Sequence, residues 1–120
     1  MISMIYVMIT MSIESAERIV EVLKEEVILE SKENAEMVVA DGSIKFENVS
    51  FKYGTSKMIL ENINLEIDSG ETIGIIGSTG SAKSTLIQLI SRLYDVTEGT
   101  VYVGGIDVRD YDLDALRDQV

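Results

Sequence analysis

The chain has 120 residues, 46% of them hydrophobic, and a formal net charge of −11, which fits at most one acidic globular domain. It contains no cysteine and no histidine, so disulfides, thiolate metal sites and imidazole catalysis are excluded. The acidic balance argues against a nucleic-acid partner, because such proteins carry a basic face. Any chemistry must therefore use carboxylates, lysine, hydroxyls, backbone groups and Mg²⁺.

Residues 1–13 are uncharged and mostly apolar. This run is shorter than the roughly 20 residues of a membrane-spanning helix, and it has no basic flank of the kind that precedes a signal peptide's apolar run. It continues into a charged stretch in which apolar residues recur at helical spacing, namely Ile13, Ala16, Val20, Leu23 and Val27. The pattern predicts one long helix. The residues alone leave open whether it is the end of a membrane helix or an amphipathic helix with an apolar start.

Residues 30–42 are polar, end in the turn signal Asp41-Gly42 and are expected to form a linker. The period then changes to two, which predicts half-polar antiparallel strands with one face toward water. A shift of the alternation at Asn48 predicts a β-bulge. The alternating apolar positions are Ile44, Phe46, Val49, Phe51, Tyr53, Ile63, Leu65 and Ile67.

A glycine-rich turn between two apolar elements is the most informative feature of the chain. The run Thr72–Ile76 predicts a strand buried on both faces, and Lys83–Tyr94 predicts a helix. Between them lies Gly-Ser-Thr-Gly-Ser-Ala-Lys-Ser-Thr, residues 77–85. A strand, a glycine-rich turn, Lys-Ser and a helix in this order are typical of a site for a nucleoside triphosphate.

The chemistry of such a turn assigns a role to each part. Backbone N–H groups from Gly77 to Ala82 face the phosphates, Lys83 reaches the β- and γ-phosphates, and the Ser84 hydroxyl binds Mg²⁺. Alanine stands at position 82, where the pattern has glycine before the lysine. Its Cβ restricts φ and narrows the space for a phosphate, although alanine is the smallest possible intrusion.

The remaining residues predict a loop over 95–99, a strand at Thr100–Val103, a turn at 104–105, a short strand at Ile106–Val108 and a helix over Leu113–Val120. Asp107 follows a short apolar strand and could imitate a metal-binding aspartate, but a solvated turn is the favoured interpretation. Gln119 is interpreted as a helix-surface residue.

The order of these parts resembles the nucleotide-binding domain of ATP-binding cassette transporters of the exporter type. The resemblance covers residues 43–120 and implies an α/β P-loop NTPase fold, incomplete here, with an antiparallel subdomain ahead of the phosphate loop. Residues 1–29 resemble the end of the last transmembrane helix with its cytoplasmic extension, and residues 30–42 its linker. The motifs that carry the resemblance are Ile44–Tyr53, Ile63–Ile67, Gly70–Gly77, Leu93–Gly99, Ile106–Val108 and Leu116–Val120.

The resemblance implies ATP and Mg²⁺ as ligands. It assigns Tyr53 to the position that stacks on adenine and Thr85 to a contact with the α-phosphate, and it repeats the roles of Lys83 and Ser84. The expected nucleotide-binding residues are Tyr53, Gly77, Ser78, Thr79, Gly80, Ser81, Ala82, Lys83, Ser84 and Thr85, with Ser84 also at the metal.

Hydrolysis in this family also needs a sensing glutamine, a metal-binding acid, a glutamate base, the partner's Leu-Ser-Gly-Gly-Gln loop and a switch histidine. None of them occurs in this sequence, so we expect no catalytic residue here. We therefore expect a piece of a longer protein that binds ATP, lacks ATPase activity by itself and has poor solubility, because the apolar strand lacks its parallel neighbours.

The resemblance implies that the intact protein hydrolyses ATP to export a substrate, with its nucleotide-binding part on the cytoplasmic side of a membrane, expected to be the bacterial plasma membrane. Its partner would be a second half-transporter, identical or different. Three alternatives remain: a cassette ATPase of an importer or soluble assembly, an ATP-binding module without hydrolysis and, less favoured, a P-loop kinase.

Overall fold

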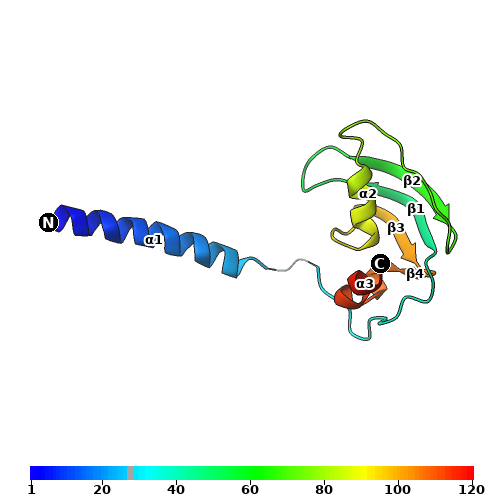
Figure 1. The fold of residues 1–120 in the computed structure, drawn as a ribbon, viewed down its shortest axis with the longest axis horizontal. Coiled ribbons are helices and arrows are strands. Elements are labelled where there is room, and N and C mark those ends of the chain that lie inside the picture. Colours follow the sequence, from blue (N-terminus) through cyan, green and yellow to red (C-terminus); the bar gives the residue numbers. More distant parts are fainter. Residues whose placement is uncertain (27–28) are drawn as a thin grey trace.

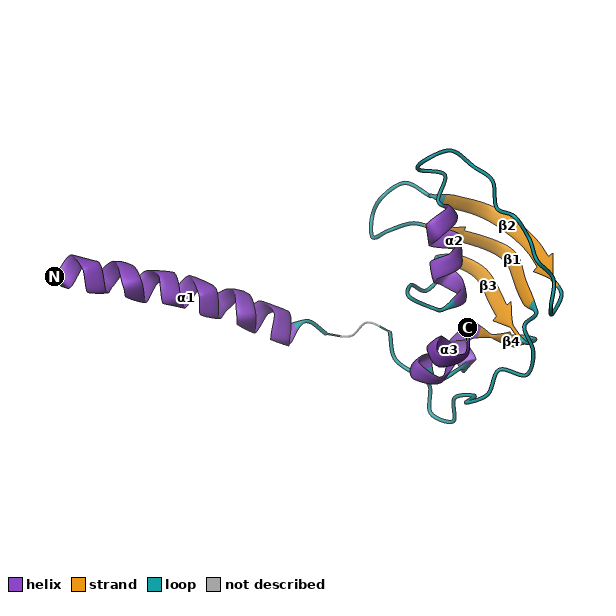
Figure 2. Cartoon of the chain, in the orientation of Figure 1, coloured by secondary structure: helices purple, strands orange, loops and turns teal. Residues whose placement is uncertain are grey.

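The computed structural model describes residues 1–26 and 29–120 (Figure 1). A long N-terminal helix, α1, precedes a part that combines a small antiparallel sheet with short helices (Figure 2). The elements are α1 (Ile2–Lys24), β1 (Ile44–Phe51), β2 (Leu60–Ile67), α2 (Lys83–Ile90), β3 (Glu98–Val103), β4 (Ile106–Asp107), the 3₁₀ helix η1 (Val108–Asp110) and α3 (Leu113–Gln119).

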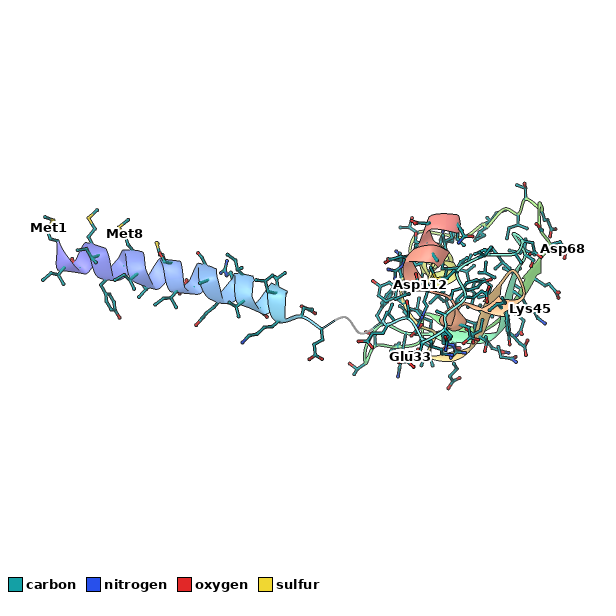
Figure 3. The ribbon with its side chains drawn as sticks, turned by 90° about the horizontal axis from the view of Figure 1, so that it is seen from below. Met1, Met8, Glu33, Lys45, Asp68 and Asp112 are labelled. Carbon is teal, nitrogen blue, oxygen red and sulfur yellow. The ribbon has the colours of Figure 1, made fainter. Side chains whose placement is uncertain are left out.

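Helix α1 confirms the long helix expected near the N-terminus. None of its residues is buried, and side chains such as those of Met1 and Met8 project freely from it (Figure 3). The helix ends at Lys24, after which Glu25 has extended backbone angles. The expected apolar position at Val27 lies outside the described residues. Among the helices of the described ranges, none has the length and apolar character needed to cross a membrane.

The sheet has the strand order β2-β1-β3-β4, and all neighbouring strands are antiparallel. The register of β1 shifts between Phe46 and Val49, and Asn48 has a left-handed φ of 49°. The extra residue lets both Phe46 and Val49 face the core, which confirms the bulge expected from the sequence. Gly99 packs against this bulge, since a Cβ on it would lie 2.3 Å from the Asn48 carbonyl oxygen.

The core lies between the sheet and the two helices α2 and α3, which Figure 2 draws on the same side of the strands. Tyr111 is fully buried, and its hydroxyl donates to the Val103 carbonyl over 2.7 Å, so its polar end is satisfied. Burial of apolar surface is the main stabilising term of such a core. The buried cluster consists of Phe46, Val49, Phe51, Leu60, Leu89, Val101, Val103, Val108, Tyr111 and Leu116.

The buried strand expected at Thr72–Ile76 is wrong for this structure. These residues form no strand, and Ile73, Ile75 and Ile76 are 40%, 41% and 99% exposed. An apolar run becomes a buried strand only when neighbouring strands satisfy its backbone and cover its side chains. Within residues 1–26 and 29–120, the four strands of the sheet pair with one another and none pairs with this segment.

The helix after the glycine-rich turn is shorter than expected, since α2 ends at Ile90 and not at Tyr94. The reason is a Schellman turn, in which the Leu93 N–H bonds to the Gln88 carbonyl and the Arg92 N–H to the Leu89 carbonyl. Arg92 occupies its left-handed position with a φ of 49°, where glycine is usual. The C-terminal helix α3 ends at Gln119, close to the expected end, and β4 gives way to η1 at Val108.

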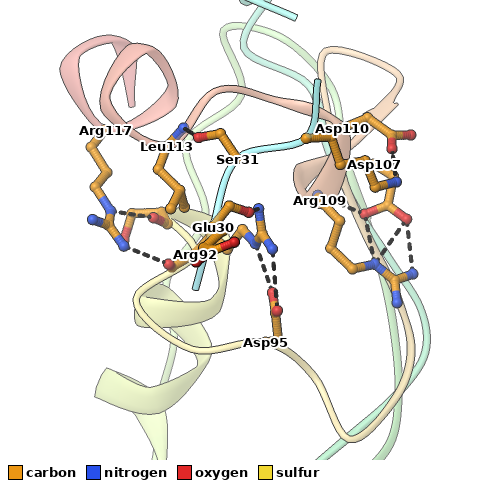
Figure 4. Close-up of polar contacts among 11 residues, drawn as sticks. Glu30, Ser31, Arg92, Asp95, Asp107, Arg109, Asp110, Leu113 and Arg117 are labelled. Carbon is orange, nitrogen blue, oxygen red and sulfur yellow. Dashed lines mark hydrogen bonds and ion pairs between the residues drawn. The ribbon is translucent and has the colours of Figure 1, made fainter. Parts of the chain in front are cut away.

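The segment 30–42 lies along the domain and is held by polar contacts (Figure 4). Lys32 forms an ion pair with Asp110, and the Ser31 hydroxyl accepts from the Leu113 N–H over 2.9 Å. A parallel bridge joins Glu36 to Tyr111. Each contact satisfies a polar group at the start of α3 or in the turn before it. The segment expected as a linker is therefore fastened to the C-terminal part of the fold.

Candidate functional site

The glycine-rich residues 77–82 form a loop that leads directly into α2. The Ser81 N–H bonds to the Ser78 carbonyl over 3.2 Å and closes a turn, and Gly80 has a left-handed φ of 85°. The helix then begins at Lys83. The loop and the first turn of α2 line a hollow of about 540 Å³, together with Ile59 from the segment before β2. No sequence motif predicts that Ile59 lines this hollow, because only the fold brings Ile59 close to the loop.

The ammonium group of Lys83 folds back into the loop. Its Nζ donates to the carbonyl oxygens of Gly77 and Ser78, each over 2.7 Å, and to the Ser81 hydroxyl over 2.9 Å. These three bonds use all the donors of a lysine side chain. They hold one positive charge at the centre of the loop, where an anion would meet it.

Gly77 lies in close contact with the polar side chains of this loop. A Cβ at position 77 would lie 2.3 Å from the Ser81 hydroxyl oxygen and 3.5 Å from Lys83 Nζ. The first distance is far inside van der Waals contact, so the space beside Gly77 is already filled by the loop's own polar side chains. Because Gly77 has no side chain, the Ser81 hydroxyl and the Lys83 ammonium group can lie close together beside it.

Ala82 takes the left-handed conformation, with φ of 59° and ψ of 22°, at the position immediately before α2. The Cβ of alanine restricts φ, but the residue nevertheless adopts glycine-like backbone angles here. This conformation costs a non-glycine residue about 1 kcal/mol or more. The loop geometry is therefore retained at the expense of local strain.

The N-terminus of α2 offers a positive end to the hollow. Its first-turn N–H groups have no partner within the helix, as at every helix start. Among the described residues, no side chain caps this end by a hydrogen bond and no acidic residue lies in its first turn. The hydroxyls of Ser84 and Thr85 also line the hollow. Free N–H groups, hydroxyls and the positive charge of Lys83 together form a site that fits an anion such as a phosphate chain.

Tyr53 lies just beyond the end of β1 and reaches α2 through its hydroxyl. The hydroxyl lies 3.1 Å from Thr85 Oγ1 and 3.3 Å from Gln88 Oε1. The ring is half-buried and meets Phe51 and Tyr94 in edge-to-face contacts, with centroid distances of 4.9 and 5.0 Å. The structure thus connects Tyr53 to the phosphate-loop helix, a link that the sequence could not indicate.

The structure brings together most of the residues selected from sequence. Thr79 to Thr85 line the hollow. The carbonyls of Gly77 and Ser78 accept from Lys83, and the Tyr53 hydroxyl contacts Thr85.

Asp107 lies away from this site, at the end of β4. Burial raises the pKa of Asp107, but hydrogen bonds from the side chain and N–H of Arg109 outweigh burial and leave the pKa below its usual value. Asp107 thus caps η1 and pairs with Arg109.

Comparison with known proteins identifies the class. Residues 60–120 match the family described as ABC transporter. The chain is 43% identical over 116 residues to the ATP-binding/permease protein YgaD of Bacillus subtilis, which carries a provisional name as a multidrug export protein. It is 46% identical over 82 residues to the ATP-dependent lipid A-core flippase of Escherichia coli strain K12. These alignments cover 93% and 68% of this chain but 20% and 14% of the two relatives.

The fold agrees with a solved structure described as a bacterial Atm1-family ABC exporter with ATP bound. The TM-score is 0.75 at 29% identity, and the match covers 95% of this chain and 20% of that one. The chain belongs to the ABC transporter family, and its α/β part is a portion of an ABC-type P-loop nucleotide-binding domain. This confirms the resemblance and the fold class expected from the sequence, and the export proteins among the relatives favour the exporter type over an importer. The chain spans about a fifth of the length of YgaD.

Proposed function

We propose that this chain binds ATP with Mg²⁺ at residues 77–85 and belongs to a protein that uses ATP to export a substrate across a membrane. The observation that carries the proposal is the Lys83 ammonium group held inside the loop by Gly77, Ser78 and Ser81, at the uncapped start of α2. An ammonium group and free N–H groups at a helix N-terminus fit an anionic phosphate chain.

The proposed roles follow the chemistry of the side chains. Lys83 would leave the loop carbonyls to contact the β- and γ-phosphates, and the N–H groups of Gly77 to Ala82 would donate to phosphate oxygens. The Ser84 hydroxyl would bind Mg²⁺, which neutralises phosphate charge when it is bound. Thr85 would donate to the α-phosphate.

Tyr53 is proposed to stack on the adenine ring. Its ring is held by Phe51 and Tyr94, and its hydroxyl by Thr85 and Gln88, so little conformational entropy remains to be lost on binding a base. Base–aromatic stacking contributes about 1–3 kcal/mol.

The membrane part of the proposal rests on α1 and on the relatives. Residues 1–13 are uncharged and apolar, and every described residue of α1 is unburied. We assign residues 1–29 to the end of a transmembrane helix and its extension, 30–42 to a linker and 43–120 to the first part of the nucleotide-binding domain. The proposed partner is a second half-transporter, with the nucleotide-binding parts on the cytoplasmic side of a bacterial plasma membrane.

The test is ATP binding by the full-length protein, measured by calorimetry with and without Mg²⁺. Lys83→Ala should weaken binding by at least about tenfold, because a charge-assisted contact is lost. Ser84→Ala should instead lower only the part of the affinity that depends on Mg²⁺. Lys57→Ala, at an exposed position before β2, is the matched control and should leave binding unchanged. The proposal is wrong if wild type takes up no ATP or if Lys83→Ala binds as tightly.

The isolated 120-residue chain should bind ATP without turning it over, since it carries none of the hydrolytic groups expected of the family. It should also aggregate through the exposed side chains of Ile73, Ile75 and Ile76. Light scattering and a phosphate-release assay check both points. Turnover by the isolated chain that disappears with Lys83→Ala would refute the first, and a monodisperse, cooperatively melting monomer the second.

A further inference from the structure

A chain of three polar side chains leads from Gln88 to the proposed phosphate site. Gln88 lies on α2 one turn after Thr85, and the Tyr53 hydroxyl stands between their side chains, 3.3 Å from Gln88 Oε1 and 3.1 Å from Thr85 Oγ1. Thr85 is buried, yet it lines the same hollow as Lys83. No nucleotide role follows from the sequence motif for Gln88.

The number of available protons decides what this chain can do. Tyr53 and Thr85 each have one hydroxyl proton, whereas the Gln88 amide has two protons on Nε2 and none on Oε1. When Tyr53 donates to Gln88 Oε1, the bond between the two hydroxyls must use the Thr85 proton. In that state Thr85 has no proton to donate to an anion in the hollow.

Rotation of the Gln88 amide by half a turn reverses the chain. Nε2 and Oε1 exchange places with almost no change of shape, so both states fit the same packing. Nε2 then donates to the Tyr53 oxygen, Tyr53 donates to Thr85, and the Thr85 proton becomes free for the hollow. A negatively charged phosphate oxygen favours this state, because hydrogen bonds to charged acceptors are about twice as strong as neutral ones and neighbouring bonds in a chain reinforce one another.

We propose that Gln88 is a positioning residue for nucleotide binding, whose amide donates to Tyr53 and thereby turns the Thr85 hydroxyl toward a phosphate oxygen of the nucleotide. This inference rests on the proposed ATP site. It requires Gln88 to act as a donor, which distinguishes it from a purely structural contact, for which an acceptor would serve equally well.

The test compares Gln88→Glu and Gln88→Leu, with and without Tyr53→Phe, by ATP titration of the full-length protein. Ionised Glu accepts hydrogen bonds and donates none, so it keeps the Tyr53 proton and holds the Thr85 proton away from the phosphate. Gln88→Glu should weaken ATP binding by roughly tenfold, the effect of one lost bond to a charged group. Gln88→Leu, which removes the amide without imposing a direction, should have a smaller effect.

Tyr53→Phe keeps the ring but removes the hydroxyl through which Gln88 acts, so the Gln88→Glu penalty should fall to less than about threefold in this background. The variant with both Tyr53→Phe and Gln88→Glu carries the same added negative charge but lacks the Tyr53 hydroxyl, so it is the matched control for the charge. Equal penalties in both backgrounds, or no penalty in either, would overturn the inference. Failure of wild type to bind ATP would instead refute the proposed function, and thermal unfolding of each variant establishes that it is folded.

Discussion

The guanidinium of Arg92 donates to the backbone carbonyl of Glu30 over 3.4 Å and so joins the end of α2 to the segment that follows α1 (Figure 4). The same guanidinium pairs with Asp95 over 2.7 Å, and its side chain is 7% exposed. Because α2 begins at Lys83, its first turn lines the candidate phosphate site and its end contacts the segment 30–42. Helix α2 thus connects the candidate phosphate site with the segment 30–42.

Arg92→Gly should be less destabilising than Arg92→Ala, although both remove the pair with Asp95. Glycine accepts the left-handed φ of 49° without strain, whereas alanine does not, and the difference should be about 1 kcal/mol in the free energy of unfolding. Calorimetric unfolding of the nucleotide-binding part measures it. Arg117, inside α3, is the control position. There Arg117→Gly should destabilise the protein more than Arg117→Ala, because glycine is a poor helix former. Equal stabilities of the two Arg92 variants would contradict the prediction.

Ala82→Gly should stabilise the protein by about 1 kcal/mol, because it relieves the left-handed alanine before α2. The melting temperature should rise, and ATP affinity should not fall. The same substitution at Ala115, inside α3, should lower stability by about 0.5–1 kcal/mol and serves as the control. A lower melting temperature for Ala82→Gly would show that the alanine conformation is not the source of strain.

Gly77→Ala should weaken ATP binding by about tenfold, since its Cβ would lie 2.3 Å from the Ser81 hydroxyl oxygen and the loop that donates to the phosphates would have to shift. Adding Ser81→Ala should restore part of the affinity. The ATP affinity should not recover fully, because the Cβ at position 77 would still lie 3.1 Å from the Cβ at position 81. Gly74→Ala, whose Cβ meets nothing within 4 Å among the described residues, should bind ATP normally. Isothermal titration distinguishes the four proteins.

Gln119→Ala should loosen the end of the segment 30–42, whose earlier residues keep their own contacts with η1 and the start of α3. The Gln119 side chain accepts from the Val39 N–H over 3.0 Å and donates to the Met37 carbonyl over 2.9 Å. Loss of the acceptor should speed hydrogen exchange at the Val39 amide by about tenfold, the effect of one lost bond. Gln119→Glu keeps the acceptor and should retain protection there. Unchanged exchange in Gln119→Ala would mean that the fold protects the amide by another route.

Acid should weaken the attachment of α3 through Asp112. The N–H of Ala115, and next the hydroxyl of Ser31, stabilise the carboxylate and hold the pKa of Asp112 below its ordinary value of 3.8. A lowered pKa in the folded state means that this stabilisation is present above the unfolded-state pKa and is lost as pH falls through the folded-state value.

Asp112→Asn retains an N-cap but does not titrate in this range. The stability advantage of wild type over Asp112→Asn should therefore be constant near neutral pH and shrink below about pH 4. Melting temperatures of the two proteins at several pH values measure it, and their difference cancels the titration of other acids. An advantage that does not change with pH would contradict the assignment.

Local patterns predicted much of the fold. Alternating apolar residues indicated β1 and β2, the change of phase at Asn48 indicated the bulge, and the glycine-rich turn before Lys83 indicated the phosphate loop. Each of these features depends on neighbouring residues, whose spacing is visible in the chain itself. The family could be inferred from the same motifs, because their order along the chain differs from that of simpler P-loop proteins.

Other features depended on contacts between distant residues. The run Thr72–Ile76 has the composition of a buried strand, but a strand forms only beside partners, and the described residues provide none. The bonds of Tyr53 to Thr85 and Gln88, and of Gln119 to the segment 30–42, join positions 32 to 82 residues apart. Sequence alone determined the loop and its donors, since these are local chemistry. Only the tertiary structure decided which side chains orient them, because that depends on how helices and strands pack in space.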